Sequence, residues 1–441
     1  MNELTMLETI SVRLKTYARR LYSSPTLRTV SAVSGGNLLA TAIALVGTLV
    51  QSRFVGPDDL GYFRQFGIVT AYAFFLQFGI SSALQRLYPL HKGQGQHDKA
   101  LAVAEICQSW NIGVSVIVSG GFTVLALVAF AQGNWRAGLA WLVQAIGIAW
   151  TFYGGYLLST YRAGHDFVSA TKGTVIMNVV NLMTLPFFII APYVALVLRN
   201  SLGNLVSFVY LHLHRPLHLR WRFNWREWLA TAKQGIWLHT AYYGVGPGKS
   251  AVEATMVLKM LGTTSLGLWS ISYGVLEILN KVAQAITSIY APRVIEEYGR
   301  TGSMKTCLRM CLRPMLWALV PVSLMGIATC VALPFVVPWL MPKYTAAVPT
   351  MRLLMIALPL LILDMPSLLI LAKGRLIWMN LLSYTGLGCF TLLGLLAARM
   401  CLGLNGIVGA SLLSQCARLG MTYMFIGSEI RKEQLNNGIA K

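Results

Sequence analysis

The sequence predicts an all-α polytopic membrane protein with about twelve transmembrane helices, arranged as two six-helix lobes around a central cavity. Hydrophobic residues occupy 56% of the 441 positions and charged residues only 12%, and the mean hydropathy is +0.60. In an ordinary soluble domain about a quarter of all residues are charged. Long apolar windows cover the chain almost from end to end, and two similar glycine-bounded turns occupy corresponding places in its halves.

Each window is long enough for a helix that crosses lipid, which needs about 20 apolar residues. The windows are continuously apolar rather than alternating, which favours helices over a β-barrel. We place them roughly at residues 29–52, 64–88, 105–131, 137–161, 173–190, 192–212, 234–258, 265–290, 314–340, 347–371, 377–399 and 403–426.

The two similar turns are GPDDLG at residues 56–61 and GTTSLG at residues 262–267. Each turn separates two long apolar spans, and internal repeats of this kind build many transporters, with the substrate path between the halves. An even number of spans in each half leaves both repeats pointing the same way across the membrane. The alternative interpretation is that glycine simply favours turns at both places.

The resulting organisation has five parts, divided at a basic segment in the middle of the chain. They are a cytoplasmic basic segment at 1–28, an N-lobe with helices 1–6 at 29–212, a cytoplasmic basic linker at 213–233, a C-lobe with helices 7–12 at 234–426, and a cytoplasmic tail at 427–441.

The net charge of +21 follows the topology of the chain and does not indicate nucleic-acid binding. Roughly 25 of the 36 Lys and Arg residues fall in loops on one side and about 7 on the other, the asymmetry that marks the cytoplasmic face. We therefore expect cytoplasmic termini and an even span count. The N-terminal segment lacks the short apolar stretch and cleavage site of a signal peptide, so we expect the first span to stay as an anchor. The seven cysteines form no metal-binding pattern.

The segment GVGPGKS at residues 244–250 resembles a phosphate-binding loop only superficially. The loop motif needs a glycine where Tyr243 stands, and it must lie between a strand and a helix of a folded α/β domain. Here the segment interrupts an apolar span. We expect Gly246, Pro247 and Gly248 to break or bend the seventh helix, as often happens beside a transport site.

Ionisable residues inside the spans are the strongest functional signal, since one at the centre of a span costs at least ~2.5–3.5 kcal/mol. Helical spacing gathers them, with other polar residues, into stripes on spans one, seven and eight, which predicts a wet cavity. As cationic substrate-binding residues we expect Arg199, Lys249, Lys281 and Arg418. As ion-coupling residues we expect Glu253, Glu277, Asp364 and His239. As polar cavity lining we expect Asn37, Thr41, Tyr242, Tyr273, Asn280 and Gln284.

The alternative is that each Lys–Glu pair, four residues apart on its helix, neutralises itself and serves packing, and that Asp364 pairs with a buried base. A guanidinium such as that of Arg199 suits a phosphate or diphosphate, which it engages with two hydrogen bonds. The carboxylates and His239 suit exchange of H⁺ or Na⁺. We expect no other cofactor and no structural metal.

Four segments resemble a known family: RFVGPDDLGY at 53–62, FGISSALQRLYP at 78–89, PKYTAAVPTMRLL at 342–354 and LGLNGIVGA at 402–410. They are similar to those of Wzx-type polysaccharide flippases, within the multidrug/oligosaccharidyl-lipid/polysaccharide exporter superfamily. The resemblance implies a MATE-like pair of lobes whose cavity opens alternately to each side of the bacterial inner membrane. It implies a polyprenyl-diphosphate-linked oligosaccharide as substrate, for O-antigen, capsule or exopolysaccharide synthesis. It further implies contact with membrane lipids and polysaccharide-assembly enzymes. We expect a monomer.

Two alternatives remain open. A drug or metabolite exporter of the same superfamily would share the architecture, although cationic drugs favour an acidic cavity. A membrane glycan polymerase or ligase would need a catalytic cluster on the outer face, and the outer loops are short. About twelve spans disfavour the lipid II flippases of the same superfamily, which usually have about fourteen. The signature of major facilitator carriers is replaced by HKGQGQHD at 91–98.

Overall fold

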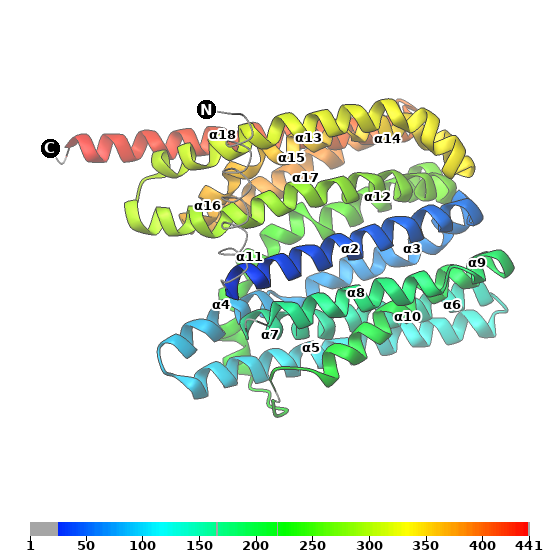
Figure 1. Cartoon of the computed structure of the whole chain (residues 1–441), viewed down its shortest axis with the longest axis horizontal. Coiled ribbons are helices and arrows are strands. Elements are labelled where there is room, and N and C mark those ends of the chain that lie inside the picture. Colours follow the sequence, from blue (N-terminus) through cyan, green and yellow to red (C-terminus); the bar gives the residue numbers. More distant parts are fainter. Residues whose placement is uncertain (1–24, 165, 218, 440–441) are drawn as a thin grey trace, which may run out of the picture.

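The computed structural model describes residues 25–164, 166–217 and 219–439. In this part of the chain the secondary structure is entirely helical. The first half of the chain, α2 to α10, forms one bundle, and the second half, α11 to α18, forms the other. The two bundles lie side by side with their helices running along a common direction (Figure 1). The predicted all-α fold is therefore confirmed.

The helices of the first bundle, the N-lobe, are α2 (Pro25–Phe54), α3 (Pro57–Ala73), η1 (Phe74–Gln77), α4 (Ile80–Gly93), α5 (His97–Ala131), α6 (Trp135–Ala149), η2 (Trp150–Gly154), α7 (Gly155–Ala163), α8 (Phe167–Met183), α9 (Phe187–Ile190) and α10 (Pro192–Leu213). The helices of the second bundle, the C-lobe, are α11 (Trp225–Val245), α12 (Pro247–Thr301), α13 (Met304–Leu340), η3 (Pro342–Ala347), α14 (Val348–Leu354), α15 (Ala357–Leu363), η4 (Met365–Ser367), α16 (Leu368–Ala372), α17 (Leu376–Arg399) and α18 (Gly403–Ile439).

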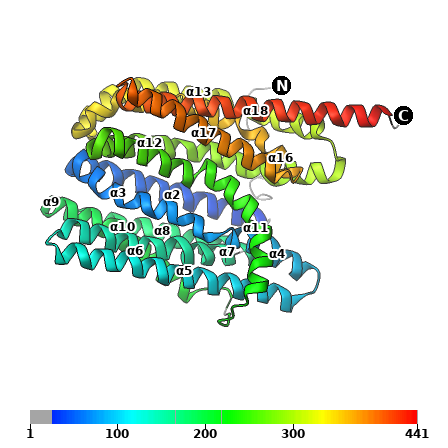
Figure 2. The ribbon, with the colours of Figure 1, turned by 180° about the vertical axis from the view of Figure 1, so that it is seen from behind.

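Nine helical stretches in the described part of the chain are long and apolar enough to cross a membrane. Helices α12 and α18 also run along the bundle, whereas α11 crosses between the two lobes at one end (Figure 2). Helix α12 contains a turn, because Gly262 has φ 84° and ψ −179°, outside the helical region. This turn divides α12 into two antiparallel spans. Together with the nine stretches and α18, these spans are consistent with the predicted count of about twelve.

The outward faces of the helices carry large apolar side chains, as a lipid environment requires. On α13, for example, Trp317 is 76% exposed and Phe335 and Trp339 are each 75% exposed. In water such a surface would aggregate. The exposed apolar surface and the helix lengths together identify a multi-pass membrane protein.

The two repeated turns pack directly against each other. A Cβ added to Gly61 would lie 1.8 Å from the carbonyl oxygen of Thr263, and one added to Gly267 would lie 1.9 Å from that of Pro57. Gly61 corresponds to Gly267 in the other turn, and Pro57 corresponds to Thr263. The two contacts are therefore equivalent. Only glycine permits such close backbone approach. The pattern is that of a local twofold axis between the lobes, which explains why both halves keep the same turn.

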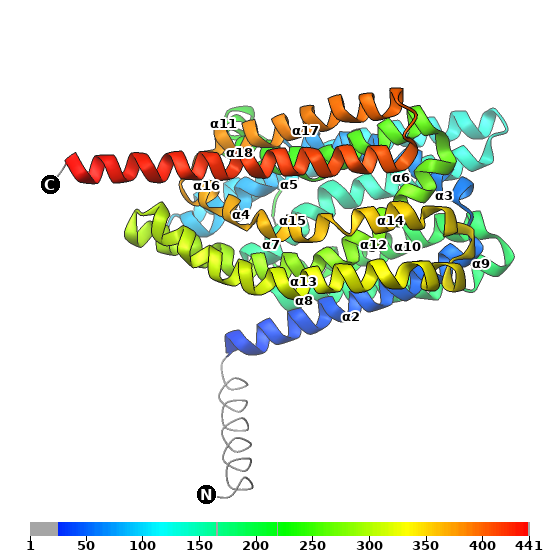
Figure 3. The same ribbon diagram turned by 90° about the horizontal axis from the view of Figure 1, so that it is seen from above.

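Further contacts join the lobes at this end of the bundle. The Lys343 ammonium donates a hydrogen bond to the carbonyl oxygen of Phe54, 2.6 Å away, and the Tyr344 hydroxyl donates one to that of Val55 at 3.2 Å. Thr264 donates a hydrogen bond to the Asp58 carboxylate. We call this set the turn-end contacts. They hold the two lobes together at the end of the bundle away from the C-terminus of α18 (Figure 3).

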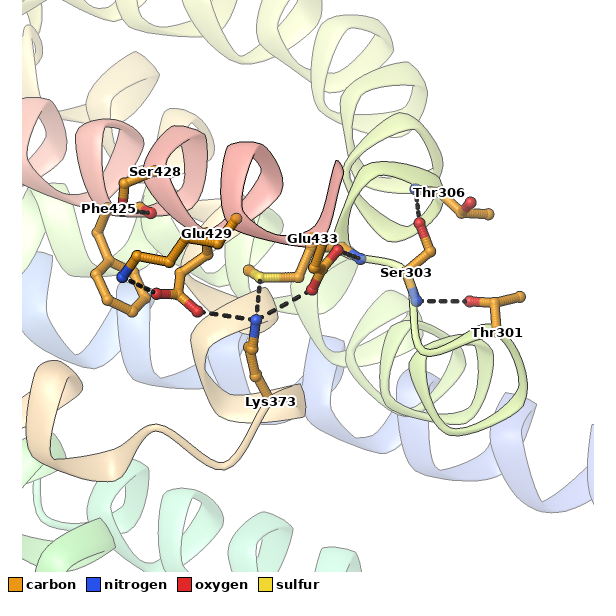
Figure 4. Close-up of polar contacts among 10 residues, drawn as sticks. Thr301, Ser303, Thr306, Lys373, Phe425, Ser428, Glu429 and Glu433 are labelled. Atoms are coloured by element: carbon orange, nitrogen blue, oxygen red, sulfur yellow. Dashed lines mark hydrogen bonds and ion pairs between the residues drawn. The ribbon is translucent and has the colours of Figure 1, made fainter. Parts of the chain in front are cut away.

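At the opposite end, a basic side chain joins three parts of the C-lobe. Lys373, between α16 and α17, lies 2.8 Å from Glu429 and 3.0 Å from Glu433, both on α18. The second carboxylate oxygen of Glu433 accepts the backbone N–H of Met304 at the start of α13, at 2.9 Å. Figure 4 shows Lys373 reaching both carboxylates. This cluster fixes the extension of α18 against the ends of its neighbours.

Candidate functional site

The first candidate site is a cavity of about 290 Å³ between the lobes, which we call the central cavity. Helices α2, α3, α8 and α10 of the N-lobe and α12 of the C-lobe form its wall. Its lining residues are Ala44, Thr48, Gln51, Leu60, Arg64, Met177, Asn181, Arg199, Asn200, Asn204, Ser270, Ile271, Gly274 and Ile278.

Arg199 is held in this wall by neutral oxygen atoms of α2. Its guanidinium donates hydrogen bonds to the carbonyl oxygen of Gly47 at 2.8 Å, to the amide oxygen of Gln51 at 2.5 Å and to the hydroxyl of Thr48 at 3.3 Å. Within the described residues it has no carboxylate partner. These bonds fix the direction of the guanidinium and leave its charge uncompensated.

Helix α2 is shaped to receive this side chain. Residues 44, 48 and 51 recur at helical spacing and so share one face, and Gly47 lies beside them. A Cβ at Gly47 would lie 2.8 Å from Nη2 of Arg199, so the absence of a side chain there makes room for the guanidinium. Asn37 and Thr41 continue the same face toward the start of α2. Asn37 is exposed and Thr41 is half-buried, and neither reaches the central cavity.

Arg64 is a cavity cation that sequence reasoning missed. We expected it in a loop, at the very start of the second span. The structure begins α3 seven residues earlier, at Pro57, and places Arg64 within the helix. There it lines both the central cavity and an adjoining pocket against α12, and among the described residues it makes no ion pair. The signal was present, since Pro at the first helical position followed by Asp58 and Asp59 marks a helix start.

The second candidate site is a smaller cavity of about 90 Å³ inside the C-lobe, which we call the C-lobe cavity. It brings together five of the residues expected from the sequence. They are Lys249, Tyr273, Glu277, Asn280 and Arg418. The polar stripes therefore divide between two cavities, whereas we expected them to line a single one.

The charges around the C-lobe cavity are largely paired. Lys249 lies 3.6 Å from Glu253, which is 1% exposed and accepts a hydrogen bond from Ser411 at 2.6 Å. Arg418 lies 2.9 Å from Asp364. Arg418 is therefore not an unpaired cation, because the end of α15 brings the carboxylate of Asp364 to it. Its role in binding substrate stays a prediction. The alternative for Asp364, pairing with a buried base, holds.

The spacing of Glu277 and Lys281 does not produce an ion pair in the described part of the chain. Glu277 faces the C-lobe cavity, while Lys281 and Gln284 are exposed. By helical spacing Lys281 lies on the face of α12 that carries Ser270 and Gly274, which line the central cavity.

His239 and Tyr242 lie outside both cavities. His239 is 4% exposed and is packed among aromatic rings, with centroids 5.3 Å from Phe74 and 6.3 Å from Tyr243. Its Nε2 has no hydrogen-bond partner. Tyr242 is 51% exposed. The predicted seventh span placed these two residues on one face with Lys249. In the structure they lie on α11 and Lys249 lies on α12, and the break between the two helices changes the direction of that face.

That break occurs at Gly246, whose φ of −106° and ψ of −105° lie outside the helical region. Helix α11 ends at Val245 and α12 begins with Pro247. Gly244 and Val245 line the C-lobe cavity beside the break. Gly248 follows in close contact, since a Cβ there would lie 2.8 Å from the carbonyl oxygen of Tyr243. Among the described residues, no three His, Cys, Asp or Glu side chains are grouped to hold a metal ion.

The chain matches a family model described as polysaccharide biosynthesis protein over residues 50–349. No curated protein sequence matches it. Its fold is similar to a multidrug resistance MATE family transporter in an inward-facing conformation, at 15% identity and a TM-score of 0.67, covering 88% of this chain and 95% of the other.

Two further solved structures share the fold. A eukaryotic MATE transporter is 14% identical with a TM-score of 0.65, covering 92% of this chain and 97% of the other. A transporter of the same superfamily from Pyrococcus furiosus, described as having a binding pocket of reverse polarity, is 13% identical with a TM-score of 0.61, covering 93% and 97%. At these identities the similarity establishes the two-lobed fold.

Proposed function

Because this chain belongs to the polysaccharide biosynthesis protein family and is a membrane transporter rather than an enzyme, we propose that it is a flippase for lipid-linked oligosaccharides. It moves a polyprenyl-diphosphate-linked repeat unit from the cytoplasmic to the outer leaflet of the bacterial inner membrane. The product serves the assembly of O-antigen, capsule or exopolysaccharide. The observation that carries this proposal is the pair of uncompensated cations, Arg64 and Arg199, in the central cavity.

An uncompensated guanidinium in a membrane protein is costly and calls for an anionic ligand. Two of them in one cavity suit a diphosphate, whose oxygens accept paired, charge-assisted hydrogen bonds. Around them Asn181, Asn200 and Asn204 offer amide groups that can hydrogen-bond sugar hydroxyls. The mixture of fixed positive charge and neutral polar groups matches a diphosphate-sugar head better than a cationic drug.

The C-lobe cavity supplies the ion coupling in this proposal. Glu277 lines it without an ion pair among the described residues, next to the pairs Lys249–Glu253 and Arg418–Asp364. Binding of H⁺ or Na⁺ at Glu277 would change the charge balance around the helix break at Gly246. Each charge that moves along the membrane potential supplies about 2.3 kcal/mol per 100 mV, which is enough to drive a transport cycle.

The same proposal fixes the orientation of the protein. The basic loops and both termini lie in the cytoplasm, by the charge asymmetry of the loops. The turn-end contacts then lie at the outer face, so the arrangement described here is closed to the outside. The polyprenyl tail stays in the lipid, the protein works as a monomer, and assembly enzymes dock on the basic cytoplasmic loops.

The test is mass spectrometry of polyprenyl-linked glycans in cells depleted of the protein, with sidedness probed by an impermeant glycosidase. We expect one complete repeat unit to accumulate, protected from the enzyme on the cytoplasmic side. Accumulation on the outer face would point instead to a polymerase or ligase. If no lipid-linked glycan accumulates, the proposal fails in favour of a drug or metabolite exporter.

A further inference from the structure

A separate hollow, outside both cavities, opens on the lipid-facing side of the N-lobe. Two adjoining pockets of about 320 and 160 Å³ lie between α5, the junction of α6 with η2, and α10. They share Ser119, Ala149 and Phe208, so we treat them as one groove, the α5–α10 groove. Its lining residues are Ile112, Ser115, Val116, Ser119, Ala145, Ile146, Ala149, Trp150, Tyr153, Asn204, Leu205, Phe208 and His212.

A local irregularity of the fourth span borders this groove. The five residues Trp150–Gly154 form a π-helix between α6 and α7. A π-helical turn widens the helix and offsets the side chains on either side of it, and such turns are frequent at functional sites. Trp150 and Tyr153 line the groove from this turn, and the small side chain of Ala149, just before the turn, lines both pockets of the groove.

One end of the groove is cationic. His212 lies in the last turn of α10. Its Nδ1 shares a hydrogen bond with the Tyr153 hydroxyl at 3.0 Å, and its Nε2 lies 2.7 Å from the guanidinium of Arg215. Arg215 has no carboxylate partner among the described residues, and its Nε is buried without a hydrogen-bond partner. This end adjoins the basic loop that follows α10, the side that our proposal places in the cytoplasm.

The other end of the groove meets the central cavity. Asn204 on α10 lines both. On α10 a row of side chains, four positions apart, extends from the central cavity to the cationic end of the groove. The row consists of residues 200, 204, 208 and 212. At 1.5 Å per residue this path is about 18 Å long. One helix thus carries Arg199 near its start and a second cationic group just past its end.

We propose that the α5–α10 groove is an entry site for the lipid-linked substrate in the cytoplasmic leaflet, before its head group reaches the central cavity. The isoprenoid chain lies along the apolar groove, and its diphosphate contacts Arg215 and His212. This inference rests on the proposed flippase function. The orientation agrees with a lipid of that leaflet, since the cationic end is at the membrane surface and the apolar part extends toward the midplane.

The first test is photo-cross-linking from two neighbouring positions on α5. A benzophenone amino acid replaces Val116, which lines the groove and is 65% exposed, or Ile117, which is 75% exposed and is not among the lining residues. The protein is placed in vesicles of phosphatidylglycerol and phosphatidylethanolamine that contain a long-chain polyprenyl diphosphate without sugar. We expect polyprenyl diphosphate adducts at position 116 and few at 117.

Two outcomes of this experiment would overturn the entry site. Equal yields of the polyprenyl adduct at both positions would mean that the lipid only samples the surface. Adducts at position 116 that consist of phosphatidylglycerol, with polyprenyl diphosphate present, would mean that the groove holds a bulk phospholipid.

The second test separates the entry site from the flippase function itself. In vesicles loaded with lipid-linked oligosaccharide, Arg215→Ala should raise the substrate concentration for half-maximal transport about tenfold, since it removes a charge-assisted contact. The maximal rate should stay near that of the wild type, and Arg215→Lys should recover part of the loss. If the wild type transports and Arg215→Ala is indistinguishable from it, the entry site is wrong and the flippase stands. If the wild type moves no lipid-linked oligosaccharide, the proposed function itself is wrong.

Discussion

At the scale of single residues, the decisive difference is between cations that are paired and cations that are not. Lys249 and Arg418 each have a carboxylate within 4 Å, so their charges are balanced before any substrate arrives. Arg64 and Arg199 have none among the described residues. In the proposed mechanism, an anion that enters the central cavity offsets the cost of keeping these two charges.

Replacing either unpaired arginine should therefore abolish most transport without loss of protein from the membrane. Hydrogen bonds to a charged group contribute ~1.5–3 kcal/mol, so Arg64→Ala or Arg199→Ala should lower the transport rate at low substrate concentration about tenfold or more. Vesicle transport assays measure this. Arg53→Ala, at an exposed arginine outside the cavity, is the matched control. Normal transport by both cavity variants would remove the cationic-cavity model.

The room that Gly47 leaves for Arg199 gives a finer test. In Gly47→Ala the new methyl group would lie 2.8 Å from Nη2 of Arg199, so the guanidinium must move while its charge is kept. We expect a smaller loss of transport than in Arg199→Ala, with a raised half-saturating concentration. Gly35→Ala, on the same helix and with no atom within 4 Å of the added Cβ, should transport normally. If Gly47→Ala transports as well as Gly35→Ala, the position of the Arg199 guanidinium does not matter for transport.

Glu277 is the cavity carboxylate without an ion pair in the described part of the chain, and it is the best-placed group for coupling. Glu277→Gln keeps the shape and removes the charge. We expect transport by this variant to lose its dependence on the H⁺ or the Na⁺ gradient, whichever drives the wild type, as measured in vesicles with each gradient imposed alone. A dependence that stays as in the wild type would exclude Glu277 from the coupling.

At the scale of the helical elements, Lys373 determines how firmly the end of α18 is held. Its hydrogen bonds lower the pKa of Glu429 below the ordinary value. Burial alone would lower the pKa of Lys373, but its bonds to Glu429 and Glu433 raise it. Lys373→Ala removes both ion pairs and leaves two carboxylates close together. We expect the free energy of unfolding to fall by roughly 1.5–3 kcal/mol, visible as a lower melting temperature in detergent.

The sign of the pH effect follows from the direction of these shifts. A carboxylate whose pKa is lowered on folding stabilises the folded state above its unfolded pKa, and the stabilisation is lost as the pH falls through the lowered value. The melting temperature of the wild type should therefore fall in acid. Glu429→Gln should flatten that part of the curve. An unchanged acid limb in this variant would show that the cluster contributes nothing to it.

Much of this fold follows from the sequence, because long apolar helices leave few alternatives in a membrane. Periodicity also identified the polar faces, but it could not say which neighbour each face meets. Helix α12 shows why: Tyr273, Glu277 and Asn280 face the C-lobe cavity, while Ser270 and Gly274, on the same helix, line the central cavity. Ion pairs such as Arg418–Asp364 join segments far apart in the chain, so they cannot be predicted from the local spacing of residues. Arg64 was missed because the apolar window begins at this residue, which placed it at the edge of the span, whereas the polar first turns of α3 extend the helix in front of it.

At the scale of the whole molecule, the two lobes must separate where the repeated turns meet if the central cavity is to open at that end. Apolar side chains such as Leu60 and Leu266 pack together there, and hydrogen bonds add to this packing, among them the bond from Thr264 to the Asp58 carboxylate. Because these two side chains touch, we expect that cysteines at both positions come close enough to form a disulfide on oxidation.

We expect the oxidised Asp58→Cys/Thr264→Cys variant to lose transport and to regain it when a reductant is added. Alternating access requires the turns to part in each cycle, and a covalent bond between them prevents this. The measurement is vesicle transport before and after reduction, with each single cysteine variant as control, because these keep the local change but cannot form the bond. The seven natural cysteines are unpaired in the structure, so the single variants also report any effect of oxidation on them. Full transport by the oxidised double variant, with the disulfide verified by mass spectrometry, would show that the substrate leaves by a route that does not open at the turns.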